Sequence, residues 1–135
     1  MAFPTGSGKA MNARRGFTLI ELMVVMAIIA VLLTIAAPRY FNHLDRAREA
    51  TLRQTLAVVR DAIDKFHGDT SNYPDSIEEL VAKRYLRAVP IDPITDSAQT
   101  WVLVPPPAAN GNGKLWDLKS GAEGSRAGGT PYAEW

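Results

Sequence analysis

The stretch "RRGFTLIELMVVMAIIAVLLTIAAPRY", residues 14–40, contains the longest apolar run in the chain. Within the 21 residues from 17 to 37, the only polar side chains are Thr18, Glu21 and Thr34. As an α-helix rising about 1.5 Å per residue, this run would be about 31 Å long, which matches the hydrocarbon core of a bilayer. A carboxylate costs about 3 kcal/mol at the centre of such a helix and less near its end. Glu21 therefore needs an explanation.

Two interpretations of this segment, as a cleaved export signal or as a plain membrane anchor, do not explain the carboxylate of Glu21. A cleaved secretory signal would place Pro38 directly after the small-residue site "IAAP", and the run is longer than a typical signal core. A twin-arginine export signal is a variant of this interpretation. A plain signal anchor is the second. Its orientation stays open, because three basic residues precede the run and three follow it: Lys9, Arg14, Arg15, Arg39, Arg46 and Arg48.

The third interpretation gives Glu21 a charged partner. No Lys, Arg or His lies between residues 17 and 37, so the partner must come from another chain or from a new amino terminus. Cleavage between Gly16 and Phe17 would create an α-amino group one helical turn before Glu21. In a staggered array, the amine of one subunit could instead reach the carboxylate of its neighbour. Leaving one partner of a desolvated pair alone costs several kcal/mol, so this pairing would set the register between subunits.

The segment "RRGFTLIELMVVMAIIAVL" resembles the N-terminal motif of type IV pilins and of the pseudopilins of type II secretion. The resemblance implies that a prepilin peptidase cuts after Gly16, that Phe17 is N-methylated, and that Glu21 acts with Phe17 in assembly. A methylated amine keeps its positive charge, so the pairing argument holds. The resemblance also implies a single pass through the bacterial inner membrane, with a cytoplasmic leader and a periplasmic C-terminal domain.

This resemblance implies a structural subunit that is not an enzyme. Its partners would be copies of itself in a helical filament, the prepilin peptidase, minor pseudopilins and an inner-membrane assembly platform, with the lipid bilayer before assembly. The filament would lie in the periplasm for a secretion pseudopilus, or outside the cell for a type IV pilus, whether the subunit is major or minor. A membrane-anchored binding module that does not polymerise is the other alternative.

An amphipathic helix is predicted to follow the apolar run. Pro38 is expected to kink the helix or to end it at the membrane surface. Beyond it, apolar residues at spacings of 4, 3, 4 and 3 form one face, namely Leu52, Leu56, Val59, Ile63 and Phe66. Phe41 and Leu44 extend this face loosely, and Gly68 is placed to end the helix. The opposite side is either solvated or a contact between subunits, and it carries Arg46, Arg53, Arg60, Asp61 and Asp64.

The rest of the chain is predicted to form a connector and a small β region. After Pro74, Asp75 or Ser76 can cap a short helix with Glu78 or Glu79 in a capping box. Its buried side would contain Ile77, Leu80, Val81 and Tyr85. Residues 89–96 are expected to be extended, and strands are expected at 100–104 and 114–119. The fold class is therefore α+β and pilin-like: a long N-terminal helix packed on a small antiparallel sheet. The predicted parts are a cleaved cytoplasmic leader (1–16), the transmembrane half of the long helix (17–38) and its amphipathic half (39–67). A connector with a short helix (68–99) and a small antiparallel β region (100–135) follow.

The C-terminal half carries a looser resemblance, to the major pseudopilins of type II secretion. It rests on "NYP", "DP", "WDL" and the terminal Trp135. That subfamily often holds calcium in its last loop, and Asp117 matches one acidic position, with Glu123 a partial substitute for others. The later acidic pair is replaced by Thr130 and Pro131, so a glycine-rich turn held by hydrogen bonds is the alternative to calcium. Tyr132 and Trp135 are expected to pin the tail onto the sheet.

Composition excludes several function classes. The net charge is +1, and without residues 1–16 the chain would keep 12 basic and 14 acidic residues. No basic patch stands out beyond the leader, which argues against nucleic acid as a partner. The absence of cysteine excludes disulfides and thiolate metal sites. His43 and His67 have no ligand-spaced partners and are expected at the surface.

Overall fold

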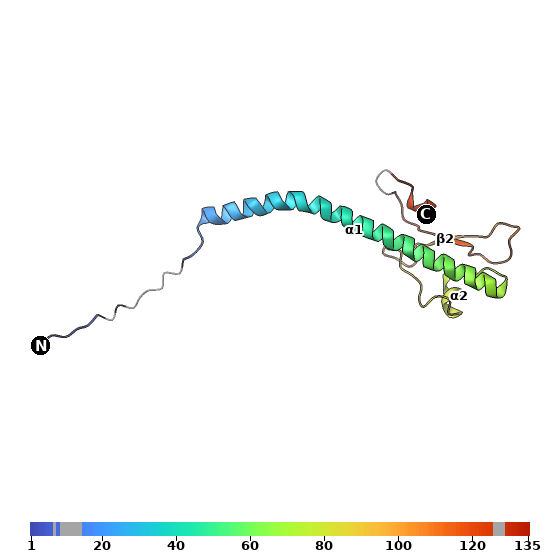
Figure 1. Ribbon diagram of the computed structural model, residues 1–135, viewed down its shortest axis with the longest axis horizontal. Coiled ribbons are helices and arrows are strands. Elements are labelled where there is room, and N and C mark those ends of the chain that lie inside the picture. Colours follow the sequence, from blue (N-terminus) through green and yellow to red (C-terminus); the bar gives the residue numbers. More distant parts are fainter. Residues whose placement is uncertain (7, 9–14, 126–128) are drawn as a thin grey trace. The chain divides into compact units, whose positions relative to one another are not determined.

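The computed structural model describes residues 1–6, 8, 15–125 and 129–135 (Figure 1). Lys9 and Arg14 therefore lie outside the described residues. The predicted α+β class is confirmed, with a long helix and a small antiparallel sheet. The elements are α1 (Leu19–Thr70), α2 (Ile77–Ala82), β1 (Val102–Val104), β2 (Asp117–Lys119) and the 3-10 helix η1 (Tyr132–Glu134).

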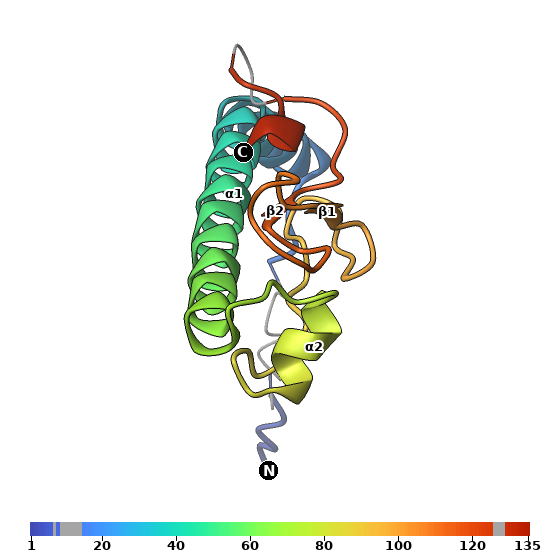
Figure 2. The same ribbon diagram turned by 90° about the vertical axis from the view of Figure 1, so that its right-hand side faces the viewer.

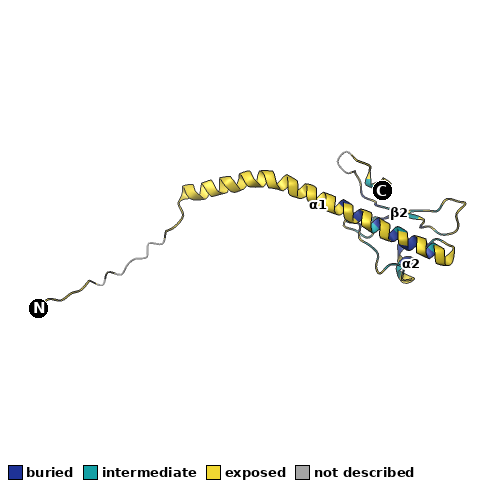
Figure 3. Ribbon diagram, viewed as in Figure 1, coloured by how far each residue is buried: buried dark blue, intermediate teal, exposed yellow. Residues whose placement is uncertain are grey.

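The chain divides into two compact units, residues 1–40 and residues 41–135, each taken here by itself. In the first unit, every described residue of α1 is exposed, although nearly all of them are apolar (Figure 3). Within the part of the chain that the structure describes, α1 is the one helix long and apolar enough to cross a membrane, judged by length and composition. Pro38 lies inside α1, so the helix does not end there. A kink at Pro38 stays a prediction.

The second unit is built on one apolar stripe of α1. The predicted stripe is confirmed, and the residues of α1 in the hydrophobic core are Leu52, Leu56, Val59, Ala62, Ile63 and Phe66 (Figure 3). The stripe does not extend to Phe41 and Leu44, which are 60% and 37% exposed. Among the described residues of α1, Glu49 is the first that is buried.

Helix α1 ends at Thr70, two residues beyond the predicted stop at Gly68. Its last turn is held by the Thr70 hydroxyl, which donates to the carbonyl of Phe66 at 2.8 Å. Ser71 then takes a left-handed conformation (φ 58°), and its N–H donates to the carbonyl of His67 at 2.8 Å. The left-handed residue that ends the helix is thus a serine rather than the expected glycine.

The predicted capping of α2 is confirmed with one change. Ser76 is the N-cap, and its side chain accepts from the N–H of Glu79 at 3.2 Å. The carboxylate of Glu79 accepts from the N–H of Asp75 at 2.7 Å, one residue earlier than in a standard capping box. Ile77 and Leu80 are buried as predicted.

The segment after α2 returns to the end of α1 through Tyr85. This half-buried phenol donates to Asp69 at 2.6 Å, and its ring packs edge-on against Phe66. The hydrogen bond to Asp69 is the main cause that raises the pKa of Tyr85 above its ordinary value. Val81, the other expected core residue of this side, is half-buried.

The connector from 89 to 96 is not simply extended, because it contains a buried carboxylate. Asp92 is fully buried and accepts from the hydroxyl of Ser120 and, at 2.9 Å, from the N–H of Ile94. A single bridge pairs Asp92 with Ser97, so the chain turns back on itself here. Buried carboxylates need such donors, since an unpaired one would be too costly.

The sheet consists of β1 and β2, antiparallel, with Leu103 opposite Leu118. Figure 2 shows it beside the second half of α1. Both strands are shorter than predicted, and residues near the start of each bond to other segments. The indole N–H of Trp101 donates to the carbonyl of Pro90 at 2.8 Å, and the N–H of Leu115 donates to the carbonyl of Pro74 at 2.9 Å.

Replacing Leu118 with Ala tests this arrangement, because Leu118 is fully buried while its strand partner Leu103 is 37% exposed. Leu118→Ala should lower the free energy of unfolding by about 3 kcal/mol, since it leaves a cavity. Leu103→Ala is the matched control and should cost about 1 kcal/mol. Urea unfolding of the full chain in detergent, followed by tryptophan fluorescence, measures both. Equal losses would contradict the described packing.

Candidate functional site

The predicted cleavage site lies in an exposed, non-helical segment. Phe17 is 88% exposed, and apart from Gly16 and its two chain neighbours no described heavy atom lies within 4 Å of the position that a Cβ on Gly16 would occupy. Helix α1 begins only at Leu19. An exposed peptide bond outside a helix is accessible to a peptidase. Cleavage between Gly16 and Phe17 and methylation of Phe17 stay predictions.

Glu21 takes part in the cap of α1. Its N–H donates to the hydroxyl of Thr18 at 3.2 Å, and its carboxylate accepts from the N–H of Thr18 at 3.4 Å. These reciprocal bonds form a capping box, and the positive end of the helix dipole favours a carboxylate at this position. This intrachain role was not predicted from the sequence, although the spacing of Thr18 and Glu21 carries the T-x-x-E signature.

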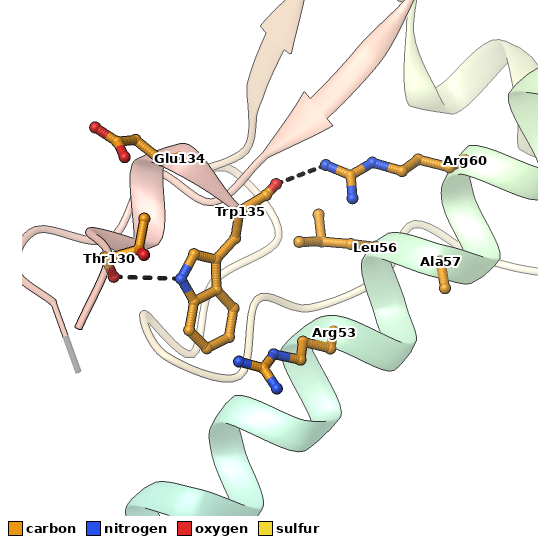
Figure 4. Close-up of a pocket in the computed structure, with 7 residues that line it drawn as sticks. All are labelled: Arg53, Leu56, Ala57, Arg60, Thr130, Glu134 and Trp135. Atoms are coloured by element: carbon orange, nitrogen blue, oxygen red, sulfur yellow. Dashed lines mark hydrogen bonds between the residues drawn. The ribbon is translucent and has the colours of Figure 1, made fainter.

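A second group of interacting residues forms around Arg60 on α1. Its Nε donates to Asp117 Oδ1 at 2.7 Å, and its Nη2 donates to the backbone oxygens of Trp135 at 2.6 Å and Leu118 at 3.3 Å. Figure 4 shows the Arg60 side chain reaching Trp135 from α1. We call Arg60, Asp117, Leu118 and Trp135 the Arg60 cluster.

Other residues of α1 bind the last six residues, 130–135, which we call the tail. The guanidinium of Arg53 lies 4.5 Å from the centre of the Trp135 ring, and the Tyr132 hydroxyl donates to Glu49 at 3.1 Å. The prediction that the tail is pinned onto the sheet is therefore incomplete, because α1 supplies these contacts. A hollow of about 380 Å³ is lined by Arg53, Leu56, Ala57, Arg60, Thr130, Glu134 and Trp135 (Figure 4).

The charged face of α1 was expected to contact solvent or other subunits. Arg53 and Arg60 instead make contacts within the chain. Arg53 and Arg60 lie four and eleven residues after Glu49, so the three share one stripe of the helix. The arginines bind within the chain because the tail and β2 reach this stripe. Asp61 fits the solvated reading, since it pairs with Lys65 on the exposed surface at 2.7 Å.

Asp117 was the candidate calcium ligand, and calcium binding there stays a prediction. Its Oδ1 already accepts from Arg60 at 2.7 Å and from the N–H of Leu118 at 2.8 Å. Calcium takes six to eight oxygens, usually with several carboxylates. Among the residues that the structure describes, no three His, Cys, Asp or Glu side chains are grouped to hold a metal. Glu123 and Thr130 are exposed.

The two histidines differ in their surroundings. His43 is exposed as expected. His67 is half-buried and stacks on Tyr73, with ring centres 4.1 Å apart and planes within 5°. His67 is therefore only partly at the surface, because the chain after α1 folds Tyr73 back onto it.

Comparison with known proteins matches residues 11–37 to the family described as "Prokaryotic N-terminal methylation motif". The chain is 44% identical over 62 residues to the type IV major alpha-pilin of Moraxella bovis, covering 44% of this chain and 39% of that pilin. It is 29% identical over 129 residues to type II secretion system core protein G of Pseudomonas aeruginosa, covering 84% and 87%. It is 33% identical over 72 residues to core protein G of Klebsiella pneumoniae, covering 53% and 51%. No solved structure matches significantly.

These similarities differ in extent. The chain spans about two fifths of the length of the Moraxella pilin and about half of the Klebsiella protein. Its similarity to the Pseudomonas core protein G extends over most of both chains. The chain is thus pilin-like and most like core protein G. Its relatives are structural pilins and pseudopilins, which confirms the prediction that it is not an enzyme.

Replacing Thr18 with Ala should loosen the start of α1. Loss of an N-cap costs about 1 kcal/mol, so the Glu21 N–H should exchange with solvent about five times faster. Thr34→Ala is the control, because the Thr34 hydroxyl donates to the carbonyl of Ala30 within the helix. Amide hydrogen exchange by NMR in detergent micelles measures both variants. An unchanged rate at Glu21 in Thr18→Ala would rule out the capping box.

Proposed function

We propose that this chain is a structural subunit of a type II secretion pseudopilus that polymerises into a periplasmic filament and helps to drive protein export. The observation that carries the proposal is the similarity to core protein G over 84% of this chain, beyond the N-terminal motif. A motif alone would support any pilin-like protein. Similarity that includes the C-terminal region supports the secretion branch.

The proposed life of the subunit begins in the inner membrane. Residues 17–38 span the bilayer once, with the leader, 1–16, in the cytoplasm and the C-terminal region in the periplasm. A prepilin peptidase removes the leader after Gly16 and methylates the new amino terminus at Phe17. The methylation motif, which covers residues 11–37, supports this order of events. The further partners are minor pseudopilins and an inner-membrane assembly platform.

Glu21 is the proposed assembly residue, acting with the charged amine of Phe17. Removal of the leader would create that amine close to the capping box at Thr18. The present carboxylate contacts with Thr18, at 3.4 and 3.5 Å, are long for charge-assisted hydrogen bonds. A positively charged amine is a stronger partner in an apolar setting than these donors. When the amine comes from a neighbouring subunit, the pairing sets the stagger of the filament.

Two other functions have a specific observation in their favour. A type IV pilus subunit is favoured by the higher identity to the Moraxella pilin, 44% over 62 residues. A membrane-anchored binding module that does not polymerise is favoured by the capping box, because it gives Glu21 a role within one chain. Processing and filament formation separate the anchored module from the proposed function.

The mass of the chain isolated from its native membrane tests processing. We expect loss of residues 1–16 and the gain of one methyl group on Phe17, measured by intact-protein mass spectrometry. The Gly16→Leu variant is the control and should keep the leader, because the peptidase is expected to need the small residue. An intact leader on the wild-type chain would refute the proposal and favour the anchored module.

Two substitutions of Glu21 separate its charge from its capping bond. Glu21→Gln keeps a side chain that can complete a capping box but removes the charge, and Glu21→Ala removes both. We expect normal insertion and processing but lost or impaired filaments in both variants, scored by electron microscopy and by secretion. Thr18→Ala, which keeps the charge, should assemble. Normal filaments from Glu21→Gln would show that capping, not pairing, is the role of Glu21.

A further inference from the structure

We propose that the positively charged Arg60 guanidinium links β2 to the tail, in the role that a metal ion would otherwise fill. The proposal rests on the contacts of the second unit and does not depend on the filament role. It also gives Asp117, an acidic residue at a position that suggests a calcium ligand, a cationic partner within the chain.

Three oxygens from two separate segments converge on this one side chain. Asp117 Oδ1 and the Leu118 carbonyl belong to β2, and the Trp135 oxygen lies at the end of η1. Their distances to Arg60 nitrogens are 2.7, 3.3 and 2.6 Å. Carboxylate and carbonyl oxygens are the ligand types that calcium selects, and they are also acceptors for a guanidinium. The geometry thus assembles a cation site in which the cation is part of the chain.

An arginine suits this position better than a point charge. Its planar group presents several donors in fixed directions, so Nε and Nη2 can bind different oxygens at once. The Arg60 and Asp117 side chains are 39% and 24% exposed, so water weakens their ion pair without removing it. The two backbone acceptors add hydrogen bonds to a charged donor, which are stronger than neutral ones.

One neighbouring contact from α1 keeps the tail close to Arg60, and two contacts within the tail fix its shape. Arg53 lies against the Trp135 ring, and Tyr132 packs edge-on against the same ring at 5.2 Å between centres. The indole N–H of Trp135 donates to the Thr130 carbonyl at 3.3 Å. These contacts hold the tail in a turn, so its last oxygen is directed at the guanidinium. Binding of the tail to Arg60 should therefore not depend on the concentration of metal ions in solution.

The test measures thermal unfolding of the full chain in detergent, in calcium chloride and in a chelator, by near-UV circular dichroism. The wild-type Tm should be the same in both solutions. Arg60→Met removes the charge but keeps an apolar stem, and should lower Tm by about 5–10 °C. Arg60→Lys keeps the charge but cannot bind three oxygens in the same way, so its Tm should lie between the Tm of the wild type and that of Arg60→Met. Arg46→Met, an exposed position on the same helix, is the matched control and should not change Tm.

Each outcome bears on the proposal. A rise in the wild-type Tm with calcium, or heat of calcium binding in a calorimetric titration, would overturn it. An unchanged Tm in Arg60→Met would overturn it as well. A calcium-dependent rise in Tm that is seen only in Arg60→Met would support it, because the metal would then occupy the vacated oxygens. If Arg60→Met does not fold, Arg60→Lys and the wild-type titration decide.

Discussion

The second unit depends on one apolar stripe of α1, from Leu52 to Phe66. Two strands of three residues have no independent stability, because a sheet of this size exposes nearly all of its backbone and both faces. Leu80, Leu115 and Leu118 are fully buried in the same cluster as this stripe. Burying a leucine contributes about 2 kcal/mol, so these three contacts outweigh what the strand pairing alone can supply. The connector and the sheet are therefore ordered by the helix.

The same helix meets two different demands along its length. Its first part is apolar on all sides and fully exposed, whereas its later part buries one stripe and presents charges elsewhere (Figure 3). A helix can serve both because it satisfies its backbone hydrogen bonds internally, whatever surrounds its side chains. The change of pattern lies in the side chains alone. One continuous α1 can therefore carry an apolar segment and an amphipathic one.

The parts that sequence predicted well are those set by local spacing. The stripe at 4, 3, 4 and 3, and the Ser76 cap of α2, follow from helical periodicity and from a signature within four residues. The contacts of Arg60 join residues 57 to 75 positions apart, so no local pattern could indicate them. The same limit explains Asp92, whose partner Ser120 is 28 residues away. Thr18 is different, because its capping signature with Glu21 is local and can be recognised in the sequence.

Glu21 shows how one carboxylate can suit two situations. A carboxylate near a helix start is stabilised by free N–H groups and by the helix dipole, so Glu21 is far less costly in a single chain than it would be at mid-helix. That stabilisation is small enough to be exceeded by a full positive charge in an apolar surrounding. A residue held by weak local bonds can exchange them for a stronger partner without first breaking a buried ion pair. Before assembly into the proposed filament, the hydrogen bonds with Thr18 would therefore keep the Glu21 carboxylate at the helix start. An amine would then replace Thr18 as the partner of that carboxylate.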